Sequence, residues 1–286
     1  MKDDNLKQNI ATVLALPIGN VSDLSLRAKQ VLESSAFLLC EDTRKARDFF
    51  RRANLKFEGK LISWPAFKER EFRDWTELFN KTLTHSSFTI VSDAGTPIVN
   101  DPGLALITAA RDHGYKIDFV PGPSAPIAAW QWSGGFGLPF VFGGFVPKNS
   151  KRKFFETLSW AKTFVCFESR HEILKTFNVL KQNPERRMWI AREMTKTHQE
   201  LIGDDVESCF QRIEYLLKQD QGVGELTLVV EGDQKESDDS IDPGKIFGEN
   251  FEDLKRFRNA PPKEAAKIAA TWSGKKTSEM YKVIFE

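Results

Sequence analysis

The stretch IVSDAGTPIVNDPG (residues 90–103) holds two glycines and two prolines, and it continues an apolar run that begins at Phe88. That run predicts a buried strand ending at Ser92-Asp93. Asp101-Pro102 then predicts the start of a helix, because Asp accepts free backbone N–H groups and Pro has none to lose. The stretch therefore predicts a sharply turned polar loop at the carboxyl end of a strand, where open α/β sheets bind ligands.

A second stretch has the same form. YKIDFV (115–120) predicts a strand, PGPSA (121–125) a turn, and the apolar residues 127–132 a helix. An ordinary crossover from strand to helix explains either loop by itself. Two such loops together predict neighbouring lips of one crevice.

The composition is that of a globular protein with a sizeable core. The 286 residues favour about two domains, and 41% of them are hydrophobic. A net charge of +1 gives no general attraction to nucleic acid or acidic lipid, so an anionic partner needs a local basic patch. Cys40 and Cys166 lie in apolar runs without a C-x-x-C pair, which predicts buried thiols and a reducing, cytoplasmic setting. No signal region and no membrane span are expected, since no apolar run approaches about 18 residues.

Strands alternate with helices along the first half of the chain, which predicts parallel βαβ units and an α/β fold. Further strands are expected at 12–16, 36–40, 60–64, 163–167, 188–191 and 226–230. One helix is expected to begin at a Ser22 or Asp23 cap, and a second to carry the basic residues from Arg44 to Arg52. Three more are expected over 69–83, 172–180 and 206–217. The Gly- and Phe-rich residues 134–147 are interpreted as a passage into a second domain.

Four segments follow from this pattern: an N-terminal α/β domain (10–125), a C-terminal α/β domain (126–232), a linker (233–250) and a helical tail (251–286). The acidic, Ser-rich composition of the linker favours a mobile segment. Amphipathic helices expected in the tail, at 262–270 and 275–285, allow a helix-turn-helix and equally a pair of helices docked on a domain.

Several chemistries lose their usual sequence support. The four histidines are scattered, without H-E-x-x-H or cysteines at ligand spacing, so no metal site is expected. There is no G-x-x-x-x-G-K-[ST], no G-x-G-x-x-G after a strand and no G-x-S-x-G. Hydrolase, NTPase and dehydrogenase functions are therefore disfavoured, and a small-molecule site built from Gly/Pro turns remains.

The loop motifs resemble those of one family. They are PIGN (17–20), EDTR (41–44), SDAGTP (92–97), DPG (101–103) and PGPSA (121–125). In this order they are similar to the ribosomal-RNA 2′-O-methyltransferases of the tetrapyrrole-methylase superfamily. The resemblance continues through GFVP (144–147), FES (167–169), AREMTK (191–196), GELTLVVEG (224–232) and PPKEAAKIAA (261–270).

The resemblance implies two α/β domains with S-adenosylmethionine in the cleft between them, a small helical tail and a cytoplasmic homodimer. The implied activity is 2′-O-methylation of a cytidine in 16S ribosomal RNA of the small ribosomal subunit. Other branches of the superfamily methylate tetrapyrroles at carbon or a modified histidine. The first loop, LPIGN (16–20), replaces the Gly-rich loop of the tetrapyrrole enzymes and so favours the RNA branch.

The chain departs from the family pattern on the expected substrate side. WPAFKE (64–69) stands where a His-rich stretch ending in Asn-Glu is usual, and Arg170-His171-Glu172 replaces Pro-His-Arg. Gly143 replaces a Glu, and Leu104 an aromatic residue. Two rivals stay open: a paralogue that methylates a small molecule such as a tetrapyrrole, and an RNA-binding relative without turnover.

Small residues in the turns would let backbone groups approach an adenosine closely, and Asp93 or Thr96 would bond its polar atoms. Phe167 and Ala191 would wall the adenine. Asp93 alternatively bonds only the backbone of its own loop. The expected cofactor contacts are Leu16, Pro17, Asp93, Ala94, Gly95, Thr96, Ser124, Ala125, Phe167 and Ala191.

A ribose hydroxyl is a poor nucleophile, so a base should help it to lose its proton. The candidates are Asp42, Asp101, Glu168 and Glu193, with Lys196 placed to stabilise an alkoxide or a phosphate. Each of them alternatively forms a structural salt bridge.

Two basic clusters are candidate phosphate contacts, or else solvated helix faces. They consist of Arg44, Lys45, Arg47, Arg51 and Arg52, and of Lys148, Lys151, Arg152 and Lys153. Trp64 and Phe67 are candidates for stacking on unpaired bases.

Overall fold

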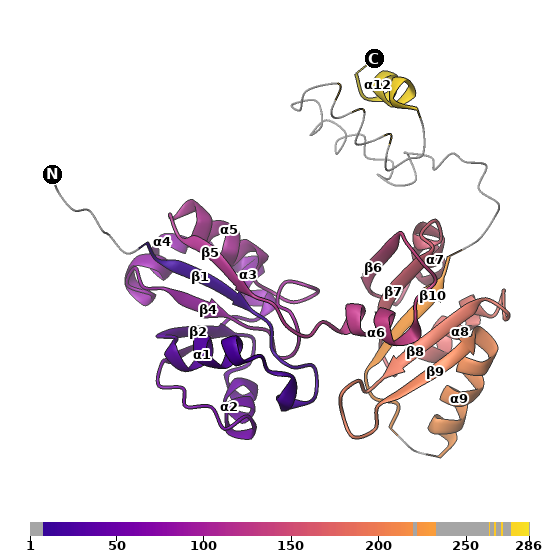
Figure 1. Ribbon diagram of the computed structural model, residues 1–286, viewed down its shortest axis with the longest axis horizontal. Helices are drawn as coiled ribbons and strands as arrows, with labels where there is room; N and C mark the ends of the chain where they lie inside the picture. Colours follow the sequence, from indigo (N-terminus) through magenta and orange to yellow (C-terminus); the bar gives the residue numbers. More distant parts are fainter. Residues whose placement is uncertain are drawn as a thin grey trace. The chain divides into compact units, whose positions relative to one another are not determined.

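The computed structural model describes residues 8–219, 222–232, 263, 266, 270 and 276–285 (Figure 1). These residues divide into two compact units. Of the described residues, the first unit contains 8–135, 142–146, 165–219 and 222–230, and the second contains 136–141, 147–164 and those from 231 on. The predicted linker, 233–250, and most of the predicted tail lie outside the described residues. The predicted boundary at 125/126 stays a prediction.

The first sheet is parallel, as the alternation of strands and helices predicts. Its strands are β1 (Ile10–Leu14), β2 (Phe37–Cys40), β3 (Lys60–Ser63), β4 (Phe88–Ile90) and β5 (Lys116–Val120). They lie in the order β3-β2-β4-β1-β5. The pairs β1–β4, β1–β5, β2–β3 and β2–β4 are all parallel, so the carboxyl ends of all five strands meet at one edge.

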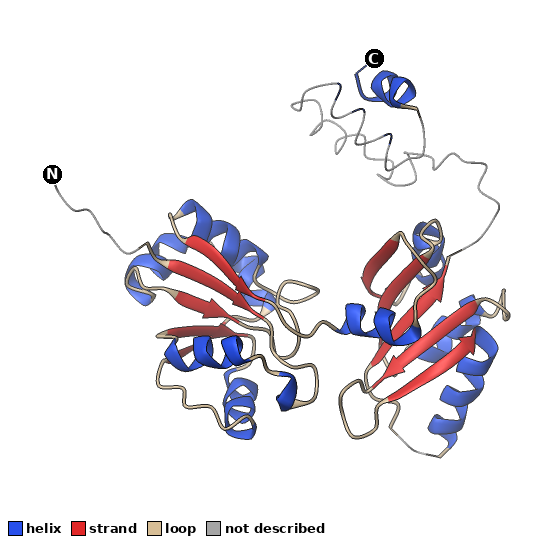
Figure 2. Ribbon diagram, in the orientation of Figure 1, coloured by secondary structure: helices blue, strands red, loops and turns tan. Residues whose placement is uncertain are grey.

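Helices cover both faces of this sheet (Figure 2). One face packs on α1 (Leu26–Ser34) and α2 (Thr43–Arg52), with Leu32 and Phe49 in the core. The other face packs on residues of α5 (Leu104–Asp112) and of a segment that is broken into α3 (Ala66–Glu71), α4 (Trp75–Glu77) and the π-helical η2 (Leu78–Thr82). Successive β2 residues serve opposite faces, Leu38 one and Leu39 the other, as the period of a strand requires.

The second sheet is mixed rather than parallel. Its strands are β6 (Phe140–Phe145), β7 (Thr163–Glu168), β8 (Arg187–Arg192), β9 (Glu200–Asp205) and β10 (Leu226–Glu231). They lie in the order β6-β7-β10-β8-β9, and β8 is antiparallel to both β10 and β9. The alternation of strands and helices seen in the first half of the chain does not continue here, because β8 is followed directly by the unpredicted strand β9.

Helices α6 (Ala125–Ser133), α7 (Lys151–Leu158), α8 (Ile173–Leu180) and α9 (Val206–Lys218) complete the two α/β arrangements, and α12 (Thr277–Phe285) lies in the tail. Helix α9 packs on β8 and β9 and against α8. No helix in the described part of the chain is long and apolar enough to cross a membrane. Cys40 and Cys166 are buried, as predicted, and so is Cys209.

Two helix starts and one helix interior differ from the prediction. Ser25, not Ser22 or Asp23, caps α1, with its hydroxyl accepting the Ala28 N–H at 3.1 Å. The expected helix 69–83 leaves helical geometry at Phe72, whose ψ is 132°. Helix α5 begins after Gly103 rather than at Asp101, and no side chain of its own caps it.

Candidate functional site

Three loops meet at the carboxyl edge of the first sheet. The Leu16 N–H, after β1, donates to the Gly95 carbonyl at 2.8 Å. The Thr96 hydroxyl, after β4, donates to the Pro123 carbonyl at 2.9 Å, and Pro123 lies in the loop after β5. Because β1 lies between β4 and β5, the two Gly/Pro loops come from strands that are not adjacent. Direct contact nevertheless joins them.

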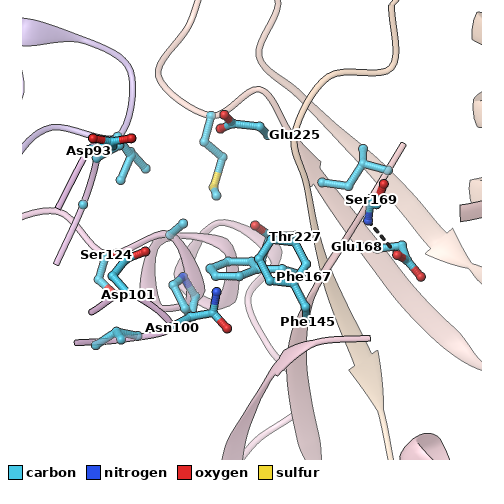
Figure 3. Close-up of a pocket in the computed structure, with 18 of the residues that line it drawn as sticks. Asp93, Asn100, Asp101, Ser124, Phe145, Phe167, Glu168, Ser169, Glu225 and Thr227 are labelled. Atoms are coloured by element: carbon cyan, nitrogen blue, oxygen red, sulfur yellow. Dashed lines mark hydrogen bonds between the residues drawn. The ribbon is translucent and has the colours of Figure 1, made fainter. Parts of the chain in front are cut away.

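A cavity of about 610 Å³ opens at these loops (Figure 3). All residues that line it belong to the first compact unit. The predicted residues among them are Asp93, Ala94, Gly95, Thr96, Asp101, Ser124, Ala125, Phe167, Glu168 and Lys45. This volume lies in the usual range of small-molecule sites.

Three predicted cofactor contacts, Leu16, Pro17 and Ala191, are not among the residues that line the cavity. Leu16 and Pro17 contribute through their backbones, since the Pro17 carbonyl accepts the Gly95 N–H at 3.4 Å. Ala191 is buried in β8. Sequence reasoning missed several lining residues, of which Glu41, Asn100, Phe145, Met194 and Thr227 are examples. Glu41 and Phe145 stand inside motifs already noted, EDTR and GFVP, and this was the available signal.

Three acidic residues from the loops after β2 and β4 line the cavity, namely Glu41, Asp93 and Asp101. Asp93 accepts the Lys45 ammonium at 2.7 Å and the Asp42 N–H at 3.3 Å, so it also braces its loop. Burial, followed by the nearby charges of Glu41 and Asp93, raises the pKa of Asp101 to about 7, although a Ser92 hydrogen bond opposes the shift. Burial also raises the pKa of Glu41. Asp101 is therefore a carboxyl that exchanges its proton near neutral pH.

The other candidate bases are engaged elsewhere. Asp42 caps α2 and pairs with the Arg44 guanidinium at 2.7 Å, and these contacts hold its pKa well below the usual range. Glu168 is buried, accepts the Ser169 N–H at 2.6 Å and the Thr176 hydroxyl, and turns toward Ser169 (Figure 3).

Glu193 and Lys196 form a local network outside the cavity lining. Glu193 accepts the Glu225 N–H at 2.8 Å and the Lys196 ammonium at 3.2 Å. Burial opposes ionisation of Glu193, but these two bonds lower its pKa overall. For Lys196 the penalty of burial is outweighed by Glu225 and Glu193, which raise its pKa. The charges of Glu193 and Lys196 therefore stabilise the 193–196 loop and its contact with Glu225.

The basic clusters are partly paired. On α2, Arg44 pairs with Asp42, and both Arg51 and Arg52 with Asp48, while Lys45 points to Asp93 in the cavity. In the second cluster Arg152 pairs with Glu156 at 3.4 Å.

Two candidate RNA contacts are little exposed. Lys151 is only 6% exposed, whereas a phosphate contact needs an accessible ammonium, so we do not carry it further as a phosphate contact. Trp64 is 1% exposed because it packs against Phe72 and Trp75, so it cannot stack on a base. Phe67, 64% exposed, stays a candidate. Within the part of the chain that is described, no group of three or more His, Cys, Asp or Glu residues is placed to hold a metal ion.

Comparison with known proteins gives the class first. The family of tetrapyrrole (corrin/porphyrin) methylases matches residues 12–208, more than half of the chain. A crystal structure of uroporphyrin-III C-methyl transferase from Thermus thermophilus, complexed with S-adenyl homocysteine, has the same fold: TM-score 0.52, 16% identity, covering 79% of this chain and 97% of that one. The chain therefore belongs to the tetrapyrrole methylase family, as its motifs predicted.

Curated relatives narrow the comparison. A Neisseria meningitidis serogroup B protein named ribosomal RNA small subunit methyltransferase I is 34% identical over 279 residues, covering 94% of this chain and 90% of the relative. A Hydrogenobaculum protein of the same name is 36% identical over 226 residues, covering 76% of this chain and 94% of the relative.

Proposed function

We propose that this protein transfers a methyl group from S-adenosylmethionine to the ribose 2′-hydroxyl of a cytidine in 16S ribosomal RNA of the small subunit. The names of its relatives support the substrate class. The observation that carries the proposal is a nucleoside-sized cavity with the Asp101 carboxyl on its wall, at a pKa of about 7. Methyl transfer to a hydroxyl needs both a donor site and a proton acceptor beside it.

The cavity residues suit the cofactor. Gly95, at φ +74°, leaves room that a Cβ would take up, since that Cβ would lie 3.2 Å from Ile18. The Asp93 carboxylate offers an acceptor to the nucleoside, and the Phe167 ring offers an apolar wall for adenine. The bound cofactor supplies the activated methyl group, and these side chains orient it and exclude water.

Asp101 is the proposed proton acceptor. Among the four candidate bases it is the one that both lines the cavity and has a pKa near neutral pH. A base whose pKa lies close to the working pH combines a large ionised fraction with useful proton affinity. Asp42, Glu168, Glu193 and Lys196 are assigned to structural contacts instead.

The RNA is proposed to meet exposed cations and a large exposed aromatic ring. The phosphate contacts that we retain are Arg44, Arg47 and Arg51 on α2 and Lys153 on α7, and the candidate for stacking is Phe67.

We further propose a cytoplasmic homodimer, and light scattering of the purified protein would test the dimer.

The proposal is tested with radiolabelled methyl donor and small subunits from a strain that lacks this gene, followed by mapping of the labelled nucleotide. We expect label on one cytidine ribose. Turnover of a small molecule without RNA would favour the tetrapyrrole-type rival. RNA binding without any methyl transfer would favour the rival that has lost turnover.

A further inference from the structure

Glu69 makes an unusual set of contacts far from its own helix. One carboxylate oxygen accepts the Gly103 N–H at 2.6 Å, and the other accepts the N–H groups of Ala105 at 2.7 Å and Leu106 at 3.1 Å. These are the free donors at the start of α5, whose N-cap, Gly103, has no side chain to satisfy them. A side chain of α3 therefore caps α5.

The segment just before this cap, Asn100–Pro102, borders two cavities. Asn100 and Asp101 line the cofactor cavity on one side and a second cavity of about 750 Å³, beside α3 and α5, on the other. The backbone is left-handed at Ile98 (φ 72°) and Asn100 (φ 74°), conformations that are unfavourable for L-residues and worst for β-branched ones. Such a backbone persists only where its surroundings fix it.

We propose that Glu69 is a positioning residue that holds the Asn100–Gly103 segment, and with it the Asp101 carboxyl, in place for proton transfer. Charge-assisted hydrogen bonds from one carboxylate to three backbone N–H groups are strong and directional. They also place a negative charge at the positive end of the α5 dipole. This inference rests on the proposed function, because it assigns Glu69 a role through Asp101.

The role makes a specific prediction for pH dependence. When Glu69 is lost, the segment relaxes toward the cavities, the Asp101 carboxyl becomes hydrated, and its pKa falls toward the ordinary range. The charged groups that line the first cavity together with Asp101 are Glu41, Lys45, Asp93, Glu168, Arg170, His171 and Glu225. In the second cavity they are Glu69 and Arg70 of α3 and Asp112 and His113 near the end of α5.

The experiment compares Glu69→Ala and Glu69→Gln with the wild-type protein. Gln keeps one acceptor oxygen and is the variant that tests the role if Ala fails to fold. Glu71→Ala, an exposed carboxylate on the same helix, is the matched control. Three quantities are measured: hydrogen exchange of the Gly103, Ala105 and Leu106 amides, cofactor affinity by calorimetry, and methyl transfer against pH.

We expect the three amides to exchange faster in Glu69→Ala and, less strongly, in Glu69→Gln. We expect kcat to fall about 10- to 100-fold, because a displacement near 1 Å costs that much. The acid limb of the pH profile should move below pH 7, with cofactor affinity changed less than about threefold. Glu71→Ala should match the wild type in all three measurements.

Unchanged amide exchange, or an acid limb that stays near pH 7 while kcat falls, would overturn the positioning role. A separate arm tests the underlying function. If Asp101→Asn keeps wild-type kcat, Asp101 is not the proton acceptor and the proposed mechanism fails. The hydrogen-exchange result still decides whether Glu69 holds the segment, so the two failures are distinguishable.

Discussion

Asp101 combines burial with two neighbouring carboxylates, and this raises its pKa to about 7. If it accepts the proton, kcat/KM should rise about tenfold per pH unit below pH 7 and level off above it. Asp101→Asn should lower kcat by about 100-fold or more and leave a residual rate without that acid limb. Steady-state methyl transfer between pH 5 and 9 measures both, and a wild-type profile that is flat through pH 7 would contradict the assignment.

The raised pKa of Asp101 should also lower the free energy of unfolding at neutral and alkaline pH. Its pKa is raised from the ordinary 3.8, so between about pH 4 and 7 the folded protein holds a proton that the unfolded chain has released. Wild-type stability attributable to Asp101 is therefore lost as pH rises through this window. Asn has no proton to lose, so Asp101→Asn should raise the Tm at pH 8 by about 2 °C more than at pH 5. Calorimetry at both pH values checks the sign.

At the scale of single residues, the sequence predicted those cavity-lining residues that lie inside a Gly/Pro turn, because such a turn is recognised from neighbouring residues alone. Asp93, Gly95 and Ser124 follow directly from Gly/Pro turns at strand ends. It did not separate Asp101 from the other acidic candidates, because that distinction depends on desolvation and on Glu41, which is distant in sequence. Trp64 was misassigned for a similar reason, since its burial depends on Phe72 and Trp75 beyond a helix break.

At the scale of elements, the true cap of α1 gives a direct test. The Ser25 hydroxyl accepts the Ala28 N–H at 3.1 Å, whereas Ser22 lies in the preceding 3-10 turn, η1 (Val21–Asp23). Ser25→Ala should lower the free energy of unfolding by about 1 kcal/mol, because it removes the cap hydrogen bond and leaves the Ala28 N–H without this acceptor. Ser22→Ala is the control and should change it by less than about 0.5 kcal/mol. Denaturant titration decides, and equal effects would refute the assignment.

The loop after β1 should be sensitive to added volume. A Cβ on Gly19 would lie 2.6 Å from the Thr195 hydroxyl and 2.9 Å from the Met194 carbonyl, so the two loops would have to separate. Ile18 and Met194 line the cofactor cavity, and Gly19→Ala should therefore weaken cofactor binding about tenfold. Gly222→Ala, where a Cβ has nothing within 4 Å, is the matched control. Calorimetric titration with the cofactor gives both affinities.

Strands with a continuous apolar sequence were predicted from the sequence, whereas strands that contain glycines or acidic residues were not. β10 (LTLVVE) was expected within one residue of its end, whereas β6 (FVFGGF) and β9 (ELIGDD) were missed. Glycines and terminal acidic residues weaken the strand signal, and pairing of β6 with β7 and of β9 with β8 forms the strands nevertheless. The cap of α5 was missed because it comes from Glu69, which no local pattern connects to Gly103.

At the scale of the whole molecule, the alternation of strands and helices predicted the parallel first sheet. It could not predict the antiparallel pairing of β8 with β9, because no helix separates these two strands.

A net charge of +1 means that RNA affinity must come from local cations. Arg47→Ala combined with Arg51→Ala on α2 should lower the slope of log K against log salt by about 1.4, since each single-strand phosphate contact contributes about 0.7. Arg27→Ala with Lys29→Ala, exposed cations on α1, is the control. Identical slopes for both pairs would remove α2 from the interface.

All three cysteines of the chain are buried thiols, and burial raises the pKa of Cys40 to about 12 and raises that of Cys209 as well. Thiolate is the species that reacts with alkylating reagents, so the folded protein resists iodoacetamide and maleimide while the unfolded chain does not. The native sequence thus carries its own reporter of global opening. A single surface cysteine added for fluorophore attachment can be labelled selectively without replacing any of the three.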